Sequence, residues 1–127
     1  MTIDHPIFTE SIRLIRLELG GTGLEPLQQQ VLERVIHSSG DFALQSLLRF
    51  SPGACQAGVS ALHAGAPILT DTAMAAAAVA PMALRTLKSS VQSVLDWAPQ
   101  KVESGLTRTA VGIERAWDQL SNEFEEP

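Results

Sequence analysis

The chain has 127 residues, of which 45% are hydrophobic, and its mean hydropathy is +0.11. This length predicts a single domain, residues 1–127, with a hydrophobic core of its own. The net charge of −5 argues against nucleic-acid binding, because a phosphate backbone is usually bound by a basic face.

The side-chain inventory excludes further classes of protein. Cys55 is the only cysteine, so neither an internal disulfide nor a zinc site made of cysteines alone is expected. No secretory signal pattern and no apolar stretch of membrane-spanning length occurs, and we therefore expect a cytoplasmic protein without membrane contact. The seven arginines outnumber two lysines, which suits a polyacidic ligand, although compositional drift explains the bias equally well.

Two amphipathic helices are predicted first. Apolar residues recur three or four positions apart over Pro6–Leu19, and the glycines that follow end this helix. A second helix is predicted from about Pro26, a residue favoured in a first turn, to the glycine stop at Gly40. His37 therefore lies in the last turn of the second helix.

Short apolar runs then alternate with helical patterns. We predict strands at Leu47–Ser51, Pro67–Asp71 and Val91–Leu95, and helices over 54–64, 73–84 and 107–120. This alternation predicts an α/β, three-layer, flavodoxin-like fold, with a mostly parallel sheet of about three strands and helices on both faces. Ligands of such sheets bind at the carboxyl ends of the strands, and Thr70 lies at one of these ends.

Familiar cofactor motifs are absent from the sequence. It has no phosphate loop of the GxxxxGK[ST] type, and the glycine cluster at 20–23 follows a helix, not a strand. His5, His37 and His63 do not have metal-ligand spacing, so no metal site is expected among them. The pattern around His37 favours a capping or partly buried histidine, although a histidine can also transfer a proton near neutral pH.

Five ordered segments carry a resemblance to a known enzyme family. They are His5-Pro6-Ile7 with the following Glu10–Ile15, then Val31–Phe42, Leu48–Ala54, Gly65–Asp71 with Met74, and Thr107–Ala110. In this order and spacing the chain resembles the precorrin-8X (cobalt-precorrin-8) methylmutases, isomerases of cobalamin biosynthesis. Because family members continue with further glycine-rich segments, the chain resembles a C-terminally shortened member.

The resemblance implies a catalytic site. The histidine that matches His37 protonates or hydrogen-bonds a corrin precursor and promotes the methyl shift that converts precorrin-8X into hydrogenobyrinate. The positions that match Ser11, Arg34 and Arg108 line the substrate pocket, and Thr70 completes the expected set of substrate-binding residues. Arginines there would bind the peripheral carboxylates, with a surface ion pair as the alternative for each.

Other functions remain open at this point. A non-catalytic shortened relative could keep the fold to bind a tetrapyrrole or a protein partner, and a structural domain is a third alternative. Retention of Ser11, Arg34, His37 and Arg108 favours the enzyme, whereas the missing segments favour the binding relative. Because a three-stranded parallel sheet exposes an edge, we also predict self-association, as a homodimer.

Overall fold

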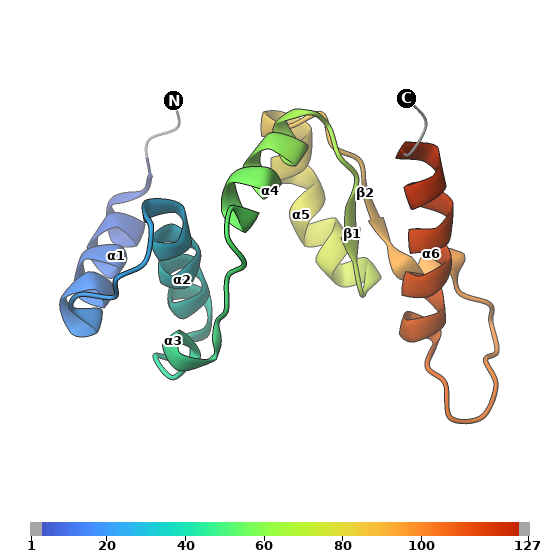
Figure 1. The fold of residues 1–127 in the computed structure, drawn as a ribbon, viewed down its shortest axis with the longest axis horizontal. Coiled ribbons are helices and arrows are strands. Elements are labelled where there is room, and N and C mark those ends of the chain that lie inside the picture. Colours follow the sequence, from blue (N-terminus) through green and yellow to red (C-terminus); the bar gives the residue numbers. More distant parts are fainter. Residues whose placement is uncertain (1–3, 125–127) are drawn as a thin grey trace. The chain divides into compact units, whose positions relative to one another are not determined.

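The computed structural model describes residues 4–124, whose helices and strands are labelled in Figure 1. The chain divides into two compact units, one ending at Gly58 and the other beginning at Val59. Helix α4 (Ala54–His63), which confirms a predicted helix, contains the point of division.

The first unit contains the two predicted amphipathic helices, α1 (Pro6–Leu19) and α2 (Pro26–Ser39). His5 caps α1, since its Nδ1 accepts a hydrogen bond of 3.1 Å from the backbone N–H of Ile7. Gly40 ends α2 in the left-handed conformation, at φ 69°, and its N–H donates to the Ile36 carbonyl at 2.7 Å. Local capping thus sets where the predicted helices begin and end.

Helices α1 and α2 pack together through four buried aliphatic side chains, two from each helix: Ile12, Ile15, Leu32 and Ile36. Four partly buried hydrophobic residues surround this core: Phe8, Leu19, Leu24 and Leu48. Full burial of an aliphatic side chain stabilises the folded state by about 1.5–3 kcal/mol. The four buried side chains therefore account for the packing of α1 against α2.

The predicted strand at Leu47–Ser51 is wrong. Residues Leu44–Leu47 form the short helix α3, and Leu48 leaves it with extended backbone angles, at φ −68° and ψ 137°. The structure describes no strand partner for residues 48–51, and Leu48 packs on the α1–α2 core. A short apolar run fits either a strand or a segment that covers a helical core, and the pattern alone cannot separate them.

The second unit holds a parallel pair of strands, β1 (Ile68–Thr70) and β2 (Val91–Ser93), with Leu69 opposite Gln92. Helix α5 (Ala73–Thr86) connects them and packs against both strands. The α/β class and the parallel pairing are therefore confirmed. Over residues 4–124, however, the sheet has two strands and not the predicted three.

The third predicted strand ends early because Ser93 starts a turn. Its hydroxyl oxygen accepts a hydrogen bond of 3.1 Å from the backbone N–H of Leu95, and a 3-10 helix, η1 (Val94–Trp97), follows. The last helix, α6 (Arg108–Phe124), confirms the helix predicted over 107–120 and packs against η1. No helix within residues 4–124 is both long and apolar enough to cross a membrane.

Candidate functional site

Ser11 and His37 meet between α1 and α2, with 2.7 Å between Ser11 Oγ and His37 Nδ1. Ser11 precedes the core residue Ile12, and His37 follows the core residue Ile36. Burial of the two isoleucines therefore brings the two polar side chains together at the edge of the core. Ser11 is half-buried, whereas His37 is exposed.

The serine hydroxyl suits an imidazole that takes part in proton transfer. It can donate to Nδ1 of a neutral ring whose proton is on Nε2, and it can accept from Nδ1–H of an imidazolium. In these two states Nε2 carries a hydrogen, whereas in the other neutral tautomer Nδ1–H donates to Ser11 and Nε2 is an acceptor. None of the residues from 4 to 124 forms a hydrogen bond with Nε2. His37 can therefore donate from Nε2 to a ligand while Ser11 holds the opposite side of the ring.

Arg34 lies one turn before His37 on α2. Its Cζ is 3.9 Å from the ring centroid of Phe8, and its Nη2 is 3.8 Å from Asp4 Oδ1. The contact with Asp4 is a surface ion pair, which was the alternative to substrate binding predicted for Arg34 from the sequence. Its distance is too long for a hydrogen bond. The guanidinium N–H groups thus remain able to bind a ligand carboxylate.

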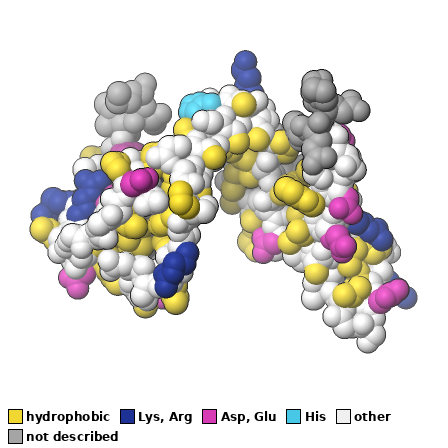
Figure 2. Space-filling view, viewed as in Figure 1, with side chains coloured by type: hydrophobic (Ala, Val, Ile, Leu, Met, Phe, Trp, Pro, Cys, Tyr) yellow, Lys and Arg dark blue, Asp and Glu magenta, His cyan; other side chains and the backbone are white. Residues whose placement is uncertain are grey.

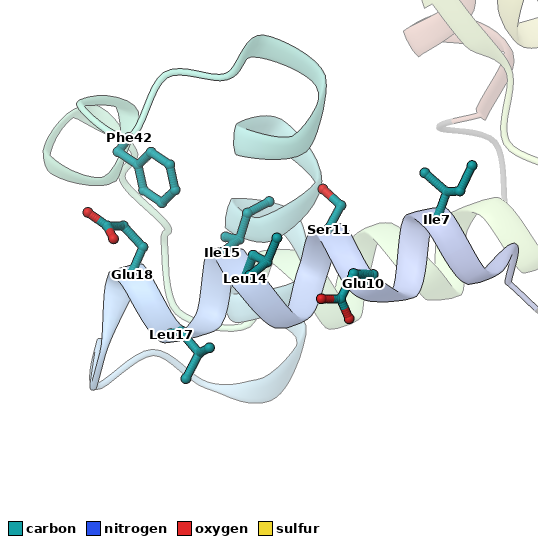
Figure 3. Close-up of a pocket in the computed structure, with 8 residues that line it drawn as sticks. All are labelled: Ile7, Glu10, Ser11, Leu14, Ile15, Leu17, Glu18 and Phe42. Atoms are coloured by element: carbon teal, nitrogen blue, oxygen red, sulfur yellow. The ribbon is translucent and has the colours of Figure 1, made fainter.

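An apolar groove of about 680 Å³ runs beside Ser11. Its lining is mostly apolar and comes from α1 and from the segment between α2 and α3, where Phe42 lies, and the carboxylates of Glu10 and Glu18 also line it (Figure 3). Figure 2 shows hydrophobic side chains gathered on the face of the first unit turned to the viewer, with charged side chains around them. A groove of this character fits a large, largely apolar ligand that has polar groups at its edge.

A second polar pair connects α1 and α2 one turn before His37. Arg16 donates two hydrogen bonds to Glu33, at 2.6 Å from Nε and 3.0 Å from Nη2, and the Glu33 side chain is only 2% exposed. The hydrogen bond from Arg16 lowers the pKa of Glu33, while burial acts in the opposite direction. This pair was not predicted from the sequence, although the position of Glu33 next to Leu32, in a helix with a buried side, was a signal for it.

The other two predicted substrate-binding residues belong to the second unit. Thr70 ends β1 and donates from Oγ1 to the Thr72 carbonyl at 2.7 Å. Arg108 begins α6 and donates from Nε to the Pro99 carbonyl at 2.8 Å. The first unit brings together Ser11, Arg34 and His37, and the functional roles of all five predicted residues stay predictions.

Comparison with known proteins gives consistent results. Residues 6–124 match the family model of precorrin-8X methylmutase. Over 93% of its length the chain is 31% identical to a cobalt-precorrin-8 methylmutase of Synechocystis, and over 90% it is 38% identical to a precorrin-8X methylmutase of Pseudomonas aeruginosa. A solved precorrin-8X methylmutase of Thermus thermophilus matches 89% of the chain with a TM-score of 0.72 and 36% identity. The chain spans 60%, 56% and 55% of the lengths of these three proteins, respectively.

Proposed function

The chain belongs to the precorrin-8X methylmutase family, and on this basis we propose that it catalyses the methyl shift that converts precorrin-8X into hydrogenobyrinate. The observation that carries the proposal is the hydrogen bond between Ser11 Oγ and His37 Nδ1, which leaves Nε2 able to act on a ligand.

The proposed reaction is an isomerisation within the substrate. The bond between the methyl carbon and one ring carbon breaks while a bond to a neighbouring ring carbon forms, and the ring double bonds shift. Donation of a hydrogen bond or a proton from His37 Nε2 withdraws electrons from the ring carbon that receives the methyl group. The step is redox-neutral and transfers no group to the protein, so the proposal includes no metal and no organic cofactor.

The proposed binding mode follows the polarity of a corrin. The apolar groove on α1 would contact a face of the macrocycle, and Arg34 would bind a peripheral carboxylate through its guanidinium N–H groups. Thr70 and Arg108 complete the proposed set of substrate contacts. The loose Arg34–Asp4 pair supports this role, because a ligand carboxylate would displace a weak contact.

We also propose that residues 1–127 form one domain with a three-layer, flavodoxin-like arrangement, and that it acts in the cytoplasm as a homodimer. The parallel β1–β2 pair joined by α5 supports the flavodoxin-like part of this proposal, because such folds are built from parallel strands connected by helices. Exposed apolar residues on α5, such as Met74 and Leu84 at 81% and 85%, support self-association. Light scattering of the purified chain tests this, and a monomer at micromolar concentration would contradict it.

Two assays with the purified chain test the proposed activity. Hydrogenobyrinic acid is titrated into wild type and His37→Ala while the visible spectrum is recorded, and turnover of precorrin-8X is then measured. We expect binding and turnover by wild type, and loss of turnover in His37→Ala. His63→Ala is the control, because His63 lies at the end of α4, outside the first unit.

Each other outcome has a definite consequence. An unchanged wild-type spectrum would contradict tetrapyrrole binding altogether. Binding without turnover would contradict the enzyme and leave the alternative, a non-catalytic relative that binds a tetrapyrrole.

A further inference from the structure

Phe8 contacts both side chains to which the proposed function assigns the chemistry. The ring centroids of Phe8 and His37 are 4.9 Å apart, and the rings are nearly perpendicular, at 82°. The guanidinium carbon of Arg34 is 3.9 Å from the Phe8 centroid. Both distances lie within the ranges of favourable aromatic and cation–π contacts.

The three side chains differ in their freedom to move. Phe8 is half-buried and packs against the buried core of α1 and α2, so this packing restricts the movement of its ring. His37 and Arg34 are exposed, and such side chains populate several rotamers unless contacts select one. The Phe8 ring, whose position is restricted by packing, can therefore favour particular rotamers of the exposed His37 and Arg34 side chains.

The arrangement follows from the geometry of α1. Phe8 and Ser11 lie three residues apart, which places them on the same side of the helix. This side of α1 therefore contacts His37 twice, through the Ser11 hydroxyl at Nδ1 and through the Phe8 ring. The hydrogen bond with Ser11 engages Nδ1, and the contact with Phe8 engages the ring as a whole. The two contacts together restrict the orientation of the imidazole.

We propose that Phe8 is a positioning residue, whose ring holds the His37 imidazole and the Arg34 guanidinium at a fixed separation. This inference rests on the proposed function for its catalytic consequence, but its structural part does not. Proton donation by His37 and carboxylate binding by Arg34 would both depend on Phe8. A side chain that only fills the core would affect neither group selectively.

The test compares Phe8→Leu, which keeps an apolar side chain but removes the ring, with Phe8→Tyr, which keeps the ring. In proton NMR spectra of the full chain, the His37 ring signals carry a shift caused by the neighbouring aromatic ring, and they are assigned with His37→Gln. We expect Phe8→Leu to lose this shift and Phe8→Tyr to retain it. With precorrin-8X we expect Phe8→Leu to lower kcat about tenfold and to raise KM about threefold, because both groups lose their orientation.

Leu24→Ala is the matched control, since Leu24 packs on the same core but precedes α2 and has no contact with His37 among the described interactions. It should lower the folded fraction and leave the His37 signals and KM unchanged. The inference is overturned if Phe8→Leu keeps the wild-type His37 shifts and KM, or if Phe8→Tyr behaves like Phe8→Leu. Because NMR needs no substrate, it tests the contact between Phe8 and His37 even if wild type shows no turnover, which would contradict only the proposed function.

Discussion

Arg16 on α1 donates two hydrogen bonds to the buried carboxylate of Glu33 on α2, across 17 residues of sequence. A second and similar pair, Arg13 with Glu10, lies within α1 and is exposed, with 57% of each side chain accessible. The two pairs have nearly the same chemistry but differ in burial and in the elements that they connect. They therefore form a natural comparison.

The first prediction concerns stability. Glu33→Gln leaves Arg16 without its ionic partner and removes charged hydrogen bonds, and we expect the free energy of unfolding to fall by about 1–3 kcal/mol. Glu10→Gln is the matched control and should change it by less than about 1 kcal/mol, since exposed pairs contribute little. Urea denaturation followed by circular dichroism measures both. Equal losses would show that the burial of Glu33 does not matter.

The second prediction concerns pH. Hydrogen bonding to Arg16 lowers the pKa of Glu33 below its ordinary value of 4.5 in the folded chain. The pair's contribution is therefore complete above about pH 4.5 and is lost as the pH falls through the lower folded pKa. We expect the stability difference between wild type and Glu33→Gln to be largest above about pH 4.5 and to shrink as the pH falls further. A difference that stays constant as the pH falls would contradict the proposed role of the ionised carboxylate.

The third prediction concerns proton donation. His37→Ala should lower kcat for precorrin-8X by about 10²–10⁴-fold, the usual contribution of a positioned acid or base, and should change KM little. Steady-state kinetics on the purified chain measures both constants. A kcat within a factor of three of wild type would remove His37 from the mechanism.

The fourth prediction concerns the partner of His37. Ser11→Ala removes the group that bonds Nδ1, and we expect kcat to fall by about 10–100-fold with the fold intact. Ser11→Thr keeps a hydroxyl and should recover most of the activity. If alanine and threonine at this position give the same kcat, the hydroxyl does not orient the imidazole.

The fifth prediction concerns packing in the second unit. Gly112 is buried in α6 against η1, and a Cβ there would overlap the carbonyl oxygen of Val94. Gly112→Ala should therefore destabilise the chain by about 1–3 kcal/mol, despite the higher helix propensity of alanine.

Gly58 in α4 supplies the control, because a Cβ there meets no atom within 4 Å. Gly58→Ala should be neutral or stabilising by up to about 1 kcal/mol. Thermal unfolding of both variants compares them directly, and a stabilised Gly112→Ala would show that α6 does not approach η1 so closely.

Local patterns predicted most of the helices and strands of this chain. The apolar spacing of α1 and α2, with Pro26 at the start and Gly40 at the end of α2, agrees with the structure, because capping and helix periodicity act over a few residues. The strand predicted at Leu47–Ser51 was wrong. Whether a short apolar run pairs with a neighbouring strand or covers a helical core depends on residues that are distant in the sequence.

The motifs and their spacing were enough to identify the family and to single out Ser11, Arg34 and His37. The hydrogen bond between Ser11 and Nδ1 of His37, across 26 residues, and the contacts of Phe8 with His37 and Arg34 became apparent only once the chain was seen folded. The physical reason is that these contacts depend on how α1 packs on α2. Burial of the core between these helices sets that register, and no periodicity within either helix specifies it.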